Sequence, residues 1–96
     1  MKIKKIIHRG WRELEHAKKK YPHDKALASI PHLFGKYQYI YSSDKGEVSL
    51  IELLNYDLDG ETLWEIYEIS NNNLFSDVER FTTKEKAERK IRRVLK

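Results

Sequence analysis

The 96-residue sequence contains no cysteine, which excludes disulfide bridges and thiolate metal sites. Its four glycines, at positions 10, 35, 46 and 60, form no phosphate-binding loop. The longest stretch without a charged residue, 26–35, is far shorter than the ~20 apolar residues that a membrane span needs. The first residues, MKIKKIIHRGW, show neither the apolar segment nor the cleavage site of a signal peptide. We therefore expect a single cytoplasmic domain, residues 1–96, with no membrane segment.

Residues that serve catalysis or metal binding are present, but not in the patterns that their chemistry requires. The serines lie in no glycine-framed elbow, and paired acids such as Glu65 and Glu68 are more typical of a solvated strand face than of acid–base chemistry. The histidines, at positions 8, 16, 23 and 32, form no zinc pattern. Residues 55–60 match the first half of an EF-hand calcium loop, but its twelfth position is Ile66, which has no carboxylate. We predict a protein that is not an enzyme and has no metal or cofactor.

Charge is distributed unevenly along the chain, although the net charge is only +4. Residues 1–41 contain ten lysines and arginines against three acids, residues 42–79 one lysine against ten acids, and residues 80–96 eight basic residues against two acids. The three segments therefore carry net charges of +7, −9 and +6. Such segregation bears on the choice of partner rather than on the fold.

The clearest structural pattern spans residues 63–95, which predict a β-hairpin followed by a helix. The run LWEIYEI is typical of a strand, SNNN supplies turn residues, and residues 74–81 predict the second strand. Thr82 and Glu85 have the spacing of a capping box, which predicts the start of a helix. Apolar residues then recur at helical spacing and form one stripe: Ala87, Ile91, Val94 and Leu95.

Two further helices are predicted before the sheet. Apolar residues over 3–21 have helical spacing. Gly10 weakens that helix by up to ~1 kcal/mol relative to alanine, which allows a start near Arg9. Asp24 is placed to cap a short second helix that ends at Ser29, before a proline.

The remaining strands complete the predicted fold. Residues 37–41 alternate tyrosine with other residues, a turn at 43–46 leads into a strand over 47–54, and residues 55–60 predict a loop. We therefore predict an α+β fold of two layers, with the order α-α-ββββ-α, in which helices cover one face of a four-stranded antiparallel sheet. The alternative is a three-stranded αβββα fold, as in double-stranded-RNA-binding domains, if residues 74–81 are not a strand.

The C-terminal third of the chain resembles short uncharacterised proteins from bacteria and their phages. The likeness lies in the strand WEIY, the strand LFSDVERF and the helix start TKEKAE. These residues are structural, so no functional residue carries over. A similar strand-to-helix join closes the small arm-binding domains of phage integrases, and some anti-CRISPR proteins belong to the same group of small phage proteins. The resemblance implies a protein of phage or mobile-element type.

The acidic middle segment leads to the main functional hypothesis. If several of its acids share the exposed sheet face or its loop end, they present a negative surface to a basic protein. We therefore expect an anti-CRISPR-like inhibitor or modulator that docks onto a nucleic-acid-handling protein such as a host nuclease. The alternative is that the two basic ends of the chain neutralise these acids. The residues expected to bind the partner are Asp57, Asp59, Glu65, Glu68, Asp77 and Glu79.

The basic C-terminal helix leads to a second hypothesis, direct binding of nucleic acid. Side chains opposite the apolar stripe can run along phosphates, and the lysines of the first helix extend this surface if the two helices lie side by side. A solubilising helix face is the alternative. The residues expected to contact nucleic acid are Lys86, Arg89, Lys90, Arg92 and Arg93.

A row of tyrosines, Tyr37, Tyr39 and Tyr41, lies on one face of a predicted strand and can stack nucleic-acid bases. The following strands are acidic and would repel phosphate, so we interpret the row as core. A homodimer formed through helices is a third, purely structural hypothesis.

Overall fold

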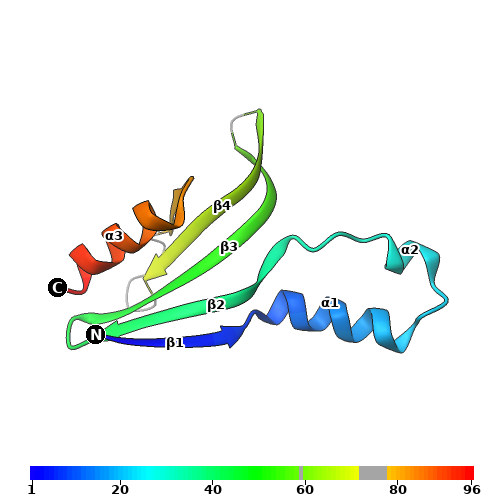
Figure 1. Ribbon diagram of the computed structural model, residues 1–96, viewed down its shortest axis with the longest axis horizontal. Helices are drawn as coiled ribbons and strands as arrows, with labels where there is room; N and C mark the ends of the chain where they lie inside the picture. Colours follow the sequence, from blue (N-terminus) through cyan, green and yellow to red (C-terminus); the bar gives the residue numbers. More distant parts are fainter. Residues whose placement is uncertain (59, 72–77) are drawn as a thin grey trace.

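A computed structural model describes residues 1–58, 60–71 and 78–96 of the protein. In this part of the chain the elements are β1 (Lys2–Ile7), α1 (Arg9–Lys20), α2 (Lys25–Ala28), β2 (Phe34–Ser43), β3 (Gly46–Leu58), β4 (Glu61–Asn71), β5 (Val78–Phe81) and α3 (Lys84–Val94) (Figure 1). The strands form one antiparallel sheet in the order β1-β2-β3-β4-β5. The predicted α+β class with an antiparallel sheet is confirmed. The predicted number of four strands is wrong, because β1 adds a further strand to the sheet. The three-stranded alternative is also wrong, because β5 joins the sheet.

The first correction concerns the N-terminal residues, where a strand replaces the predicted start of the helix. Ile3 is paired with Tyr41 and Ile7 with Tyr37, at the edge of the sheet. A spacing of four residues fits one helix face, but it also fits one strand face, because alternate strand residues point the same way. The β-branched isoleucines favour the strand. The helix begins at Arg9, as the weakening effect of Gly10 indicated.

Helix α3 packs across one face of the sheet and closes the main core. Cross-strand pairing places Leu50 of β3 beside Tyr39 and Ile69, so that these side chains share the face beneath the helix. The buried residues of this core are Tyr41, Val48, Leu50, Ile69, Ala87, Ile91 and Leu95. The predicted apolar stripe is therefore confirmed for three of its four residues, whereas Val94 is 40% exposed.

Helix α1 does not cover the sheet, in contrast to the prediction. It contains no buried residue and projects beyond the end of β1 (Figure 1). Aromatic contacts hold it instead to the start of β2 and the connector before it. Trp11 stacks on His32 of the connector with ring centroids 3.6 Å apart, and the N-cap His8 stacks on Phe34 of β2 at 4.4 Å. On the sheet face opposite α3, Leu53 and Ile66 are paired across β3 and β4, and both are buried. They form a smaller apolar contact that is separate from the main core.

Several element boundaries also differ from the prediction. The loop predicted over residues 55–60 is largely strand: β3 continues to Leu58 and β4 begins at Glu61, with Asn55 at a φ of 54° inside β3. Asp24 caps α2 as predicted, because its carboxylate accepts a hydrogen bond from the backbone N–H of Leu27 at 3.0 Å. Of the strand predicted over 74–81, β5 accounts for Val78–Phe81, and the rest lies outside the described residues.

The capping box predicted for α3 is wrong by one residue. The N-cap is Thr83, whose hydroxyl accepts a hydrogen bond from the backbone N–H of Lys86 at 3.3 Å. Glu85 then occupies the second helical position. Its negative charge interacts favourably with the positive end of the helix dipole there, but it cannot complete the capping box. None of the helices in the described residues is long and apolar enough to cross a membrane.

Candidate functional site

A groove with basic walls lies between the C-terminal half of α3 and the first residue of the chain, which are neighbours in Figure 1. Its volume is about 570 Å³. We call it the basic groove; it is lined by Met1, Arg89, Arg92, Arg93 and Lys96. Arg89 precedes Arg92 and Arg93 by three and four residues, so the arginines lie on the side of α3 away from the buried stripe, and Lys96 follows just beyond the end of the helix. Amphipathicity of α3 is therefore what gathers these cations.

Most of the positive charge in the basic groove is uncompensated. Arg92 Nη2 lies 3.9 Å from Glu88 Oε2, a long contact on a surface where ion pairs contribute little. Within the described part of the chain, no carboxylate lies within ion-pair distance of Arg89, Arg93 or Lys96. Such a cluster creates a positive potential that attracts polyanions.

The residues predicted to contact nucleic acid are only partly brought together. Arg89, Arg92 and Arg93 line the basic groove, whereas Lys86 is exposed outside it. Lys90 Nζ lies instead 3.7 Å from Glu79 Oε1. Lys96 completes the groove, although it was not among the predicted contacts. The lysines of α1 do not extend this surface, because α1 lies at the other end of β1 (Figure 1).

The acids predicted to bind a basic partner do not form one surface. Glu68 and Glu79 lie on opposite faces of the sheet, as the pairing of β4 with β5 shows, and each has a cation nearby. Arg80 Nε lies 3.3 Å from Glu68 Oε2, and Lys90 pairs with Glu79. For these two acids the structure agrees with neutralisation by the basic C-terminal segment.

The other predicted acids belong to the β3–β4 hairpin or fall elsewhere. Asp57 is exposed near the end of β3. Glu65 is exposed on β4, where its carboxylate accepts a hydrogen bond from the Tyr67 hydroxyl. Asp59 and Asp77 lie outside the described residues.

The tyrosine row of β2 is divided between core and surface. Tyr41 is buried and Tyr39 packs against the core, which confirms the core interpretation for these two residues. Tyr37 is 37% exposed and lies beyond the helix, where Lys5 Nζ stands 3.9 Å from its ring centroid.

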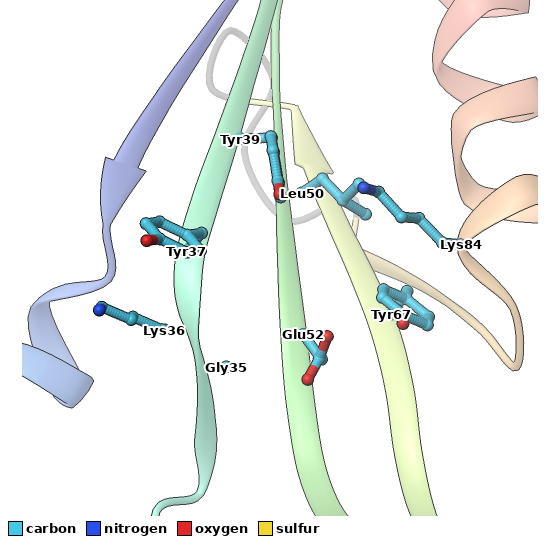
Figure 2. A pocket seen from close by; sticks show the side chains of 8 residues that line it. All are labelled: Gly35, Lys36, Tyr37, Tyr39, Leu50, Glu52, Tyr67 and Lys84. Carbon is cyan, nitrogen blue, oxygen red and sulfur yellow. The ribbon is translucent and has the colours of Figure 1, made fainter.

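A second hollow, which we call the tyrosine cavity, lies beside the first turn of α3 (Figure 2). Its volume is about 100 Å³. Its lining comes from β2, β3, β4 and α3: Gly35, Lys36, Tyr37, Tyr39, Leu50, Glu52, Tyr67 and Lys84. No motif predicts this cavity. The one available signal is the alternation along β3, in which Glu52 is in phase with the buried Val48 and Leu50.

Glu52 is the polar centre of the tyrosine cavity. Gly35 approaches it closely: a Cβ at position 35 would lie 2.9 Å from the Glu52 Cβ. Burial raises the pKa of the Glu52 carboxyl, and the charge and hydrogen bond of Glu65 raise it further. Burial and a hydrogen bond to Glu65 likewise raise the pKa of Tyr67. The cavity therefore holds one carboxyl group, Glu52, and the neighbouring Glu65 repels it when both are ionised.

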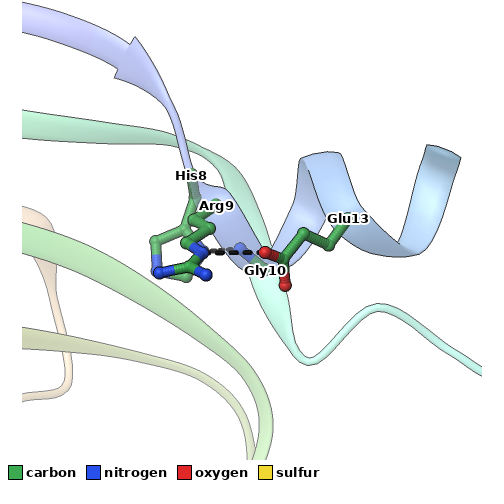
Figure 3. Close-up of polar contacts among 4 residues, drawn as sticks. All are labelled: His8, Arg9, Gly10 and Glu13. Carbon is green, nitrogen blue, oxygen red and sulfur yellow. Dashed lines mark hydrogen bonds and ion pairs between the residues drawn. The ribbon is translucent and has the colours of Figure 1, made fainter.

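The polar contacts at the start of α1 are structural (Figure 3). His8 is the N-cap, and its Nδ1 accepts a hydrogen bond from the backbone N–H of Gly10 at 3.0 Å. Arg9 Nε lies 2.7 Å from Glu13 Oε1 on the exposed helix surface. No group of three or more histidine, aspartate or glutamate side chains in the described residues is placed to hold a metal ion.

Comparison with known proteins yields no relative: no protein-family model, no curated protein and no solved structure matches the chain. The resemblance to short phage proteins therefore stays a prediction. The features that bear on function are therefore the basic groove, the tyrosine cavity and the charges around them.

Proposed function

We propose that the protein binds nucleic acid through the basic groove. The observation that carries this proposal is the convergence of Arg89, Arg92 and Arg93 with Lys96 on one groove, with a single long ion pair among them. Three guanidinium groups suit this role, because each presents a planar fork of donors that matches the oxygens of a phosphate.

The chemistry of the basic groove favours contact with the phosphate backbone. None of the described residues that line it is aromatic, so they offer no platform on which bases can stack. Binding through phosphates is insensitive to base sequence and strongly dependent on salt. With four cations engaged, the slope of log affinity against log salt for duplex DNA would be about −3.6. Affinity would then fall roughly 100-fold between about 50 and 200 mM salt.

Fluorescence anisotropy with labelled duplex DNA, single-stranded DNA and RNA tests this proposal. The double variant Arg89→Ala/Arg93→Ala is expected to lose at least about tenfold in affinity and about two units of salt slope. The matched control is Lys19→Ala/Lys20→Ala, which removes the same charge from the exposed face of α1. Absence of binding to every probe at low salt, or an equal loss in both variants, would contradict the proposal.

A second candidate function is docking onto a basic protein through the acidic end of the β3–β4 hairpin. One observation favours it: contact between β3 and the β2 side of the sheet ends at Leu54, whose backbone N–H donates a hydrogen bond to Leu33 O at 2.9 Å. Beyond Leu54, β3 pairs with β4 alone and extends past the rest of the sheet (Figure 1). Residues 46–79 contain neither lysine nor arginine. The projecting end therefore carries acids without neighbouring cations in the sequence, which suits a positively charged partner.

A pull-down against purified nucleic-acid-handling proteins separates this candidate from the first. Asp57→Asn/Glu65→Gln is expected to lose a partner that Glu68→Gln/Glu79→Gln retains, because the latter two acids are already paired within the protein. Equal capture by both variants would refute docking through the hairpin.

A further inference from the structure

We propose that the tyrosine cavity is a binding site for an organic ammonium group, such as the end of a lysine side chain, and that Lys84 occupies it as a displaceable internal substitute. This inference is independent of nucleic-acid binding, because the cavity shares no lining residue with the basic groove. It rests on three features of the cavity: its rings, its carboxylate and the position of Lys84.

The rings of the cavity are already used by ammonium groups. Lys84 Nζ lies 4.4 Å from the centroid of the Tyr39 ring, and Lys5 Nζ lies 3.9 Å from that of Tyr37. An ammonium group within about 6 Å of an aromatic face is attracted by the negative face of the ring. Tyr67 adds a third ring from β4. The cavity thus presents several faces suited to a cation, and none of its three rings belongs to the fully buried core.

The Glu52 carboxylate supplies the complementary negative charge. Figure 2 shows Glu52 on β3, between Gly35 on one side and Tyr67 on the other. Burial raises the pKa of the Glu52 carboxyl and the charge of the nearby Glu65 raises it further, whereas the positive charge of Lys84 lowers it. A cation beside Glu52 therefore stabilises its ionised form, as Lys84 does.

Lys84 is placed to leave the cavity without loss of a partner. Its side chain is 40% exposed, and its Nζ also lies 3.7 Å from Glu88 Oε1, one turn further along α3. Figure 2 shows the side chain reaching from α3 toward Leu50 and Tyr39. Movement of the Lys84 side chain away from Tyr39 would leave Glu88 within reach and would free the ring for an incoming group. The cavity volume of about 100 Å³ corresponds to roughly three waters of about 30 Å³ each, which suits an ammonium group with its last methylenes.

Nuclear magnetic resonance titration of the whole chain at constant ionic strength tests the proposal. The probes are n-butylammonium, which mimics a free amine, and the peptide Gly-Gly-Lys-Gly-Gly. Binding is followed at the backbone amides of Gly35 and Leu50. Removal of the internal competitor in Lys84→Ala is expected to strengthen binding about threefold, and loss of the carboxylate in Glu52→Gln to weaken it by about the same factor or more.

Matched variants control for the change in net charge: Lys45→Ala for Lys84→Ala, and Glu85→Gln for Glu52→Gln, both at exposed positions outside the cavity. A peptide that binds more tightly than butylammonium would identify a protein side chain as the ligand, and equal binding a small free amine; either result supports the site. The proposal is overturned if neither probe shifts the Gly35 and Leu50 resonances in Lys84→Ala, or if each variant matches its control.

Discussion

Replacement of Gly10 by alanine has two opposing effects on stability: it raises helix propensity, but it introduces a methyl group where the packing leaves no room. Gly10 lies in the first turn of α1, where alanine would be favoured over glycine by about 1 kcal/mol on propensity alone. A Cβ at this position, however, would lie 2.8 Å from Phe34 Cδ2 and 3.2 Å from His8 Cε1. A contact below 3 Å requires either the ring or the helix to move. The structure therefore predicts the opposite sign from the helix pattern.

The magnitude follows from what holds the ring in place. Phe34 stacks on His8, and His8 in turn caps the helix, so a displaced ring disturbs both the stack and the cap. Overpacking of this kind costs about 1–3 kcal/mol. After the propensity gain of about 1 kcal/mol is subtracted, Gly10→Ala should destabilise the protein by about 1 kcal/mol. For a chain of this length the melting temperature should fall by about 5 °C.

Urea unfolding followed by circular dichroism measures this change, and a second variant identifies its cause. In a Phe34→Leu background the ring is gone, so the substitution of Gly10 by alanine should become neutral or stabilising. If Gly10→Ala stabilises the native sequence by about 1 kcal/mol, or if its effect is the same in both backgrounds, the close approach of Phe34 to α1 is refuted.

Two further predictions concern α3 and the N-cap. Ile91→Ala should reduce the free energy of unfolding by about 2–5 kcal/mol because Ile91 is fully buried. Thermal unfolding should show a much smaller loss for Val94→Ala, because Val94 is partly exposed. Equal losses in the two variants would contradict the packing of α3. Burial lowers the pKa of His8 from 6.5, and only the neutral ring can accept the Gly10 hydrogen bond. The stabilisation from this cap should therefore be complete above pH 6.5 and be lost as the pH falls through the lower pKa of the folded state. Relative to His8→Asn, which keeps a cap without a titrating group, the native protein should lose stability between about pH 7 and pH 5 in urea unfolding; a constant difference would contradict the assignment.

The elements that the sequence predicts well are those whose pattern has one structural reading. The stripe that includes Ala87 and Ile91 fits a helix and not a strand, because the step of three from Ile91 to Val94 breaks the alternation of a strand face. Ile3 and Ile7 fit either a helix or a strand, and the choice depends on pairing with β2, whose residues are thirty or more positions away. The cap of α3 illustrates a finer limit: Thr82 and Thr83 are adjacent, and only the backbone geometry selects the second.

The candidate sites were less predictable, because they depend on contacts between distant elements. The helical spacing of Arg89, Arg92 and Arg93 predicts a shared face, but the groove exists because α3 ends beside the start of β1. The tyrosine cavity requires that Gly35 of β2 lie close to Glu52 of the neighbouring strand β3. An acid in phase with apolar strand residues, as Glu52 is, indicates a polar group on a buried face, but it does not reveal which side chains surround it.

The charges that are segregated along the chain are partly mixed in the folded protein. Pairing of β4 with β5 and packing of α3 bring the acidic and basic segments together, so that Arg80 faces Glu68 and Lys90 faces Glu79. These pairs place a cation beside acids that a linear count would assign to a partner. Exposed pairs of this kind contribute at most about 1 kcal/mol to stability, so their main consequence is to confine the unpaired charge to separate places. The basic groove and the projecting end of the β3–β4 hairpin lie on different parts of the protein (Figure 1). The two proposed modes of binding are therefore compatible, because a polyanion in the groove would not cover the end of the hairpin.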